Sequence, residues 1–188
     1  KGHNIQEWAS LGFLTSLNDI AERENWDEKL PKFIQPVMKY KGNYVAVPIN
    51  IHRVNWLWFN QALFQQANLA VPKTLDQLIA VMPKLQAASI LPFAHTSEPW
   101  ADAILFESIT LSVLGAEDYQ RAFVDLDVAV LNSPQMHKAF GYLRQISQYI
   151  DDDARGRSWD QATKMLVKDQ AAMQIMGDWV LGELGQQQ

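Results

Sequence analysis

Apolar and polar residues follow two different periods along this chain. Apolar residues spaced three or four positions apart predict helices at 8–12, in short pieces between 19 and 37, from 61 onward, at 75–82, at 98–114, at 134–150 and from 159 onward. Runs of β-branched or continuous apolar residues predict strands at 44–49, 54–60 and 90–94, a strand with a turn at 122–131, and a strand or buried run at 171–176. Because helices alternate with short strands, the pattern indicates an α/β fold.

Residue types at several boundaries support these helices. Segments 74–77 and 158–161 carry a Thr or Ser followed three residues later by Gln, the pattern of a capping box, and Ser133 precedes a proline suited to the first helical position. Pro83 conflicts with the helix that follows residue 74, because proline lacks the N–H group and clashes with the preceding turn. We therefore expect that helix to kink or stop near Met82.

Composition excludes several classes of protein. The 188 residues, 48% hydrophobic and 20% charged, allow one globular domain or one domain with part of a second. Lys and Arg number 16 against 21 Asp and Glu, for a net charge of −5, so nucleic acid is not an expected partner. No apolar stretch approaches the roughly 18–20 residues of a membrane-spanning helix, and direct membrane insertion is not expected. The absence of Cys excludes disulfides and thiolate metal sites.

Familiar catalytic and cofactor motifs are missing from the sequence. Glycine-rich phosphate loops, zinc-protease motifs and nucleophile elbows do not occur, and the four His stand apart, so we expect no cofactor and no metal. The acidic run 151–156 lacks the spacing of a calcium loop and is expected to be solvated surface. A glycosidase needs two carboxylates around the scissile bond, and Glu98 or Glu107 with Asp160 or Asp178 remains open for that role.

Tryptophans are numerous and are spread along the chain. They are Trp8, Trp26, Trp56, Trp58, Trp100, Trp159 and Trp179. Several stand beside hydrogen-bonding residues at element boundaries, as in 98–100, 158–160 and 177–179, and the polar pair 52–53 lies at another boundary. Sugars suit such a mixture, because a pyranose has an apolar face that stacks on an aromatic ring and a rim of hydroxyls that need polar partners. Core packing is the alternative for each indole.

Several segments resemble the solute-binding proteins of bacterial ABC sugar importers (extracellular solute-binding protein family 1), the family of maltose-binding and glucose/mannose-binding proteins. The markers are YKGNYVAVP at 40–48, WFN at 58–60, PKTLDQL at 72–78, and AAM at 171–173 leading to MGDW at 176–179. Segments 50–58 and 156–163 look most like the glucose/mannose branch. One departure is KDQ at 168–170, where the family usually has Gly-Lys, and it alters a turn rather than the site.

The resemblance implies an α/β, periplasmic-binding-protein-like (type II) fold of two lobes joined by hinge segments. Segment 47–54 looks like the first hinge crossing. Residues 1–52 are then the end of the first-lobe segment with that crossing, and residues 53–188 most of the second, C-terminal lobe. The chain is expected to be an internal fragment that covers mainly the second lobe, because two such domains need roughly twice this length.

The resemblance also implies a set of ligand-binding residues and no catalytic ones. They are His52, Arg53, Glu98, Trp100, Trp159, Asp178 and Trp179. The histidine supplies a polar contact at the hinge, which Arg53 can share, and the three indoles wall the sugar cleft. Asp178 has an alternative role, that of capping or orienting a neighbouring backbone group. Trp56 and Trp58 are expected to be structural, on one face of a strand.

The function that follows from the resemblance is sugar capture for import. The chain would bind a mono- or small oligosaccharide, of glucose/mannose type, and the lobes would close over it so that membrane permease subunits recognise the closed form. We expect a monomer without enzymatic activity, periplasmic, or an extracellular membrane-anchored lipoprotein in a Gram-positive host. Two alternatives remain at this point: a glycoside hydrolase, and a binding protein for another solute such as an oligosaccharide, polyol or peptide.

Overall fold

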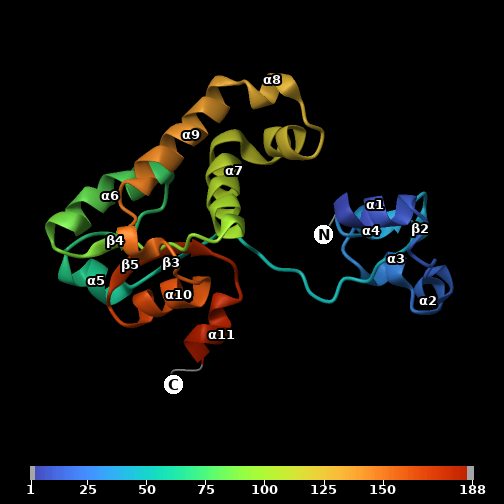
Figure 1. The fold of residues 1–188 in the computed structure, drawn as a ribbon, viewed down its shortest axis with the longest axis horizontal. Coiled ribbons are helices and arrows are strands. Elements are labelled where there is room, and N and C mark those ends of the chain that lie inside the picture. Colours follow the sequence, from blue (N-terminus) through green and yellow to red (C-terminus); the bar gives the residue numbers. More distant parts are fainter. Residues whose placement is uncertain (1–2, 186–188) are drawn as a thin grey trace. The chain divides into compact units, whose positions relative to one another are not determined.

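The computed structural model describes residues 3–185 of the chain (Figure 1). Its internal contacts divide the chain after Ile51 into two compact units, here called unit 1 and unit 2. None of the helices within the described residues is both long and apolar enough to cross a membrane.

Unit 1 consists of short helices and one β-hairpin. Its elements are α1 (His3–Ser10), α2 (Asn18–Arg23), α3 (Trp26–Lys29), α4 (Gln35–Met38), β1 (Lys39–Tyr40) and β2 (Asn43–Tyr44). Lys41 and Gly42 turn the hairpin with φ of 48° and 83°, as a tight two-residue turn requires. Tyr44 is buried beside Trp26 at a ring separation of 5.2 Å, and its hydroxyl donates to Asp27 at 2.7 Å. This small core holds unit 1 together.

The predicted strand at 44–49 is wrong beyond Tyr44. Residues 45–51 have no regular secondary structure, and Ile49 is 96% exposed. A run of β-branched residues becomes a strand only where a neighbouring strand and a buried face receive it, and beyond Tyr44 the β1 side offers only the Met38 carbonyl, which accepts from the Val45 N–H at 3.0 Å.

Unit 2 is built on a three-stranded sheet in the order β3-β5-β4. The strands are β3 (Trp56–Phe59), β4 (Leu91–Phe93) and β5 (Ala171–Met176), which confirms the strands expected at 54–60, 90–94 and 171–176. β5 lies in the centre, antiparallel to β3 and parallel to β4. All its residues are buried, which explains why its sequence is nearly continuous in apolar residues rather than alternating.

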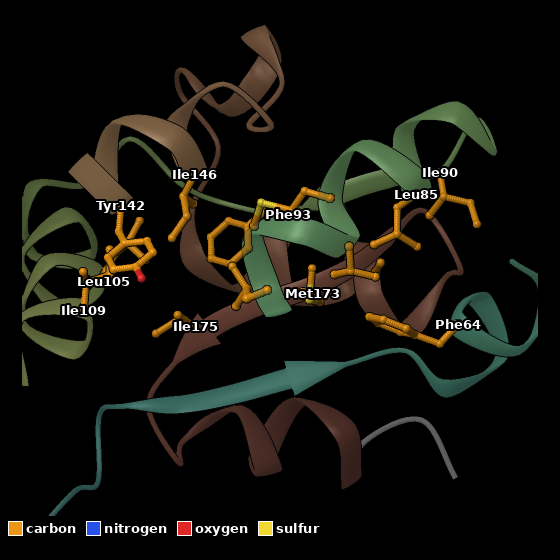
Figure 2. Close-up of a cluster of buried hydrophobic side chains, with 14 of the residues drawn as sticks. Phe64, Leu85, Ile90, Phe93, Leu105, Ile109, Tyr142, Ile146, Met173 and Ile175 are labelled. Atoms are coloured by element: carbon orange, nitrogen blue, oxygen red, sulfur yellow. The ribbon is translucent and has the colours of Figure 1, made fainter. Parts of the chain in front are cut away.

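Helices cover both faces of this sheet (Figure 1). The helices of unit 2 are α5 (Gln61–Gln66), α6 (Leu75–Ala87), α7 (Pro99–Phe123), α8 (Val128–Leu131), α9 (Pro134–Ser147), α10 (Trp159–Val167) and α11 (Val180–Gly185), with a 3₁₀ turn at Asp152–Ala154; α8 lies away from the sheet, against α7 and α9. The main core lies where α6, α7 and α9 meet the sheet; it includes Leu85, Phe93, Ile109, Ile146 and Met173 (Figure 2). A smaller cluster joins α10 to β5 through Ala162, Leu166 and Ala171.

The expected helix boundaries are confirmed at the caps. The Thr74 hydroxyl accepts from the N–H of Gln77 at 3.2 Å, and the Ser133 hydroxyl accepts from the third residue after it, also at 3.2 Å. The side-chain oxygen of Gln161 accepts from the N–H of Ser158 at 2.9 Å. Each bond satisfies a backbone donor that a helix leaves without a partner.

α6 does not stop near Met82, and the strand expected at 122–131 does not form. α6 continues through Pro83 to Ala87, because Pro83 lies on the exposed face while Leu85 is fully buried on the other, and this packing outweighs one lost hydrogen bond. The strand at 122–131 is absent: α7 runs to Phe123, and the carboxylate of Asp127 caps α8. The helix expected to end near 114 does break at Gly115, with φ 78° and ψ 173°, and then resumes.

Candidate functional site

One edge of the unit 2 sheet gathers the predicted ligand-binding residues. β3 is antiparallel to β5 with Trp56 opposite Met176, so segment 52–53 before β3 meets segment 177–179 after β5. β4 is parallel to β5, so the chain leaves both strands at this same edge. Ligands of open α/β sheets bind beyond the carboxyl ends of the strands. The topology therefore presents a candidate site there.

Asp178 joins the two chain segments. Its Oδ1 lies 2.7 Å from Nδ1 of His52, and its Oδ2 accepts from the backbone N–H of Arg53 at 3.2 Å. The Asp178 N–H donates to the Arg53 carbonyl at 2.9 Å. The hydrogen bonds from His52 and from the Arg53 N–H lower the pKa of Asp178, because both stabilise the carboxylate. Arg53 thus contributes its backbone here, and its side chain is exposed.

Trp179 stands at the centre of an aromatic cluster. Three rings meet its own with centroid separations of 5.3 Å for His52, 6.0 Å for Trp100 and 6.4 Å for Trp159, each in an edge-to-face arrangement. We call these four residues the aromatic cluster. Trp100 is 39% exposed, whereas Trp179 also packs on the buried Val180. The cluster therefore rests on the core and opens to solvent at Trp100 and His52.

Glu98 connects the beginnings of α7 and α10. It is the residue before the first turn of α7, and its Oε2 accepts from the N–H of Trp159, the first residue of α10, at 2.9 Å. The Glu98 N–H in turn donates to the Thr96 hydroxyl oxygen at 3.2 Å. A carboxylate at a helix N-terminus is favourable, because the N–H groups there lack helical partners. Glu98 consequently holds the segment that carries the Trp159 indole.

The structure thus brings all the predicted site residues into one connected group, and Trp58 packs beneath it on the same buried residues as Trp159 and Trp179. The rings of Trp56 and Trp58 lie 5.3 Å apart on one face of β3, as expected from the strand period. The Trp58 indole N–H donates to the Met176 carbonyl at 3.1 Å. This bond braces β3 against β5 and supports the expected structural role.

Sequence reasoning missed the brace behind Glu98. The Thr96 hydroxyl donates to the carbonyl of Arg157, 61 residues away. The Arg157 guanidinium forms a two-pronged ion pair with Asp151 and donates to the His95 carbonyl at 3.2 Å. In the sequence, an arginine two residues before the predicted helix was the one signal of this brace. Asp151, expected to be solvated surface with the rest of its run, is half-buried in this pair.

Carboxylates near the cluster are held in their ionised form. Lys164 and the Ser158 hydroxyl bind Asp160 and lower its pKa to about 2, and the pKa of Asp178 is lowered as well. Glu107 lies along α7 beside Tyr119, whose pKa is raised to about 12 chiefly by burial and also by this carboxylate.

No group of three or more His, Asp or Glu within residues 3–185 is arranged to hold a metal ion.

The site thus combines partly exposed rings with fixed polar groups. The sequence of the chain also matches a known protein family. Residues 2–187 match the profile of the bacterial extracellular solute-binding proteins. The chain belongs to this family. A relative named "probable sugar-binding periplasmic protein", from Rhizobium meliloti, is 40% identical over 97% of this chain and 44% of its own length. The chain therefore spans less than half the length of this curated relative of the solute-binding family.

Solved structures support the same fold. A chitin oligosaccharide binding protein superposes with a TM-score of 0.82 at 20% identity, covering 96% of this chain and 45% of the other. A sugar transporter from Arthrobacter chlorophenolicus, solved with bound laminaribiose, gives a TM-score of 0.78 at 22% identity, covering 96% of this chain and 46% of the other. This solute-binding chain thus forms part of the α/β, type II periplasmic-binding-protein-like fold, since it covers less than half of each of these two structures.

Proposed function

We propose that this chain is part of the sugar-binding component of an ABC importer and that the aromatic cluster contributes one wall of the sugar site. The exposed Trp100 ring and the half-buried rings of Trp159 and Trp179 suit the apolar face of a pyranose. The imidazole of His52, oriented by Asp178, suits a hydroxyl at the rim. This juxtaposition of edge-to-face rings and oriented polar groups at one sheet edge is the observation that carries the proposal.

Each polar residue has an assigned part in the proposed site. His52 uses Nδ1 for Asp178, so Nε2 is the nitrogen that meets the sugar. Asp178 acts through the His52 ring, since both of its oxygens are engaged. Glu98 uses Oε2 to hold α10, and we assign its Oε1 to a sugar hydroxyl. The exposed side chain of Arg53 is assigned to the rim of the site.

The proposed mechanism is closure of two lobes around the sugar. We assign residues 1–52 to the end of the first-lobe segment with the first hinge crossing, and residues 53–188 to most of the second lobe. The division of the chain after Ile51 supports this boundary, as do residues 45–51, which have no regular secondary structure. A sugar that contacts both lobes favours the closed state by the difference in its affinity for the two states, and permease subunits would recognise that state.

Binding without catalysis fits the carboxylates better than hydrolysis does. A glycosidase needs a general acid whose pKa is raised, whereas the pKa values of Asp160 and Asp178 are lowered by their partners. Glu98 is engaged by the backbone of α10, and Glu107 lies beside Tyr119. We therefore propose that the protein binds its ligand without catalysis. We propose further that it is monomeric and either periplasmic or, in a Gram-positive host, an extracellular lipoprotein.

The test is a titration of intrinsic tryptophan fluorescence in the complete gene product with glucose, mannose, galactose and maltose. Indoles that contact a sugar change their emission, so a saturable response to glucose or mannose supports the glucose/mannose proposal. A response to galactose or maltose alone supports sugar binding and refutes that finer assignment. Silence toward all four by a folded protein refutes the simple-sugar proposal, and release of product from an aryl glycoside would refute the absence of catalysis.

A further inference from the structure

Gly177 lies directly beneath the ring of Trp179. A Cβ atom added to Gly177 would stand 2.2, 2.3 and 2.5 Å from Cζ3, Cη2 and Cε3 of that indole. Carbon atoms in ordinary contact are about 3.5–4.0 Å apart. No side chain therefore fits at position 177 while the indole keeps its place.

The backbone conformation of Gly177 does not itself require glycine. The glycines with positive φ among the described residues are Gly12, Gly42, Gly115 and Gly156. Gly177 is not one of them. The close approach of the ring is thus the steric reason that the structure offers for glycine at this position.

The chain on both sides of Gly177 has little room to yield. Met176 before it is fully buried and pairs with Trp56 on β3. Asp178 after it is held through its N–H and its carboxylate by segment 52–53. A methyl group at position 177 would therefore move the indole rather than the backbone.

We propose that Gly177 is a positioning residue that seats the Trp179 indole at the centre of the aromatic cluster. Restoring ordinary contact would move the nearest ring atom by about 1.3–1.8 Å, and that ring meets His52, Trp100 and Trp159. One methyl group would thus disturb every ring pair of the cluster. The consequence for sugar affinity rests on the proposed function, whereas the seat of the ring does not.

The first experiment reads the ring without ligand. The complete gene product is labelled with 5-fluorotryptophan, and the ¹⁹F resonance of Trp179 is assigned by its loss in Trp179→Phe. Gly177→Ala is expected to shift this resonance. Gly141→Ala, in α9, is the matched control, since a Cβ there meets nothing within 4 Å. An unmoved Trp179 resonance in Gly177→Ala would overturn the proposal.

The second experiment is a double-mutant cycle in thermal stability. Gly177→Ala is expected to lower the Tm in the parent and to have little effect in a Trp179→Leu background, because the clash partner is gone. An equal loss in both backgrounds would show that position 177 rejects a side chain for another reason and would overturn the proposal. The cycle remains informative if Gly177→Ala alone folds poorly, because the double variant is then expected to regain its fold.

Sugar affinity is measured last, on the same variants. Gly177→Ala is expected to weaken binding about five-fold or more, the lower range for the loss of one aromatic stack. The Trp179→Leu background should show no further loss. A shifted resonance with unchanged affinity would support the seat of Trp179 and refute its part in sugar binding, so failure of the two proposals is distinguishable.

Discussion

Replacing Trp100 by Ala separates ligand stacking from packing. Trp100 is the most exposed indole of the aromatic cluster, at 39% of its surface, and it meets Trp179 at 6.0 Å and 62°. An edge-to-face pair contributes about 0.5–1.5 kcal/mol beyond the burial of its area, so the loss of stability is expected to be at least of that size. A sugar stacked on the ring would lose about 1–3 kcal/mol, by analogy with bases stacked on aromatic residues, which is roughly a 5- to 150-fold rise in Kd.

Isothermal titration calorimetry gives Kd for the sugar that quenches fluorescence, and urea denaturation gives the free energy of unfolding. Phe140→Ala is the control: Phe140 is 54% exposed and its ring lies 4.5 Å from that of Phe106, outside the aromatic cluster. Phe140→Ala should lower the free energy of unfolding by an amount similar to Trp100→Ala and leave Kd unchanged. Unchanged affinity in Trp100→Ala, with the same loss of stability, would refute the stacking role.

Three further perturbations test other parts of the structure. The pKa of Asp178 is lowered on folding, so its bond to His52 stabilises the protein above the ordinary value of 3.8 and is lost as pH falls through the lowered pKa; Asp178→Asn should flatten the acid side of a Tm–pH profile, and an unchanged slope would contradict the pairing. Glu98→Ala removes a charged acceptor from the Trp159 N–H and should speed hydrogen exchange of that amide relative to the remaining amides of α10, while equal exchange would rule out the proposed brace. Phe93→Ala empties a fully buried position and should cost about 3–5 kcal/mol in urea unfolding; a loss under 1 kcal/mol would contradict its place in the core.

Local patterns were sufficient for the elements that depend on neighbours in sequence. The caps at 74–77 and 158–161 act within one helical turn, and the buried strand at 171–176 is marked by its own apolar run. Patterns misled where distant packing decides. Pro83 remains inside α6 because the opposite face of the helix is buried. Residues 45–49 do not form a strand because no neighbouring strand pairs with them.

The residues of the candidate site were identifiable from sequence, through resemblance and through the chemistry of indoles beside polar groups, yet their mutual roles were not. Asp178 contacts His52 across 126 positions, and Glu98 contacts Trp159 across 61. Such pairs arise because β5 lies between an antiparallel and a parallel neighbour, which brings three chain segments to one edge. Sequence therefore nominated the side chains that we propose meet a sugar, and the tertiary structure decided which of them hold one another in place, because only burial and strand pairing bring distant residues within hydrogen-bond reach.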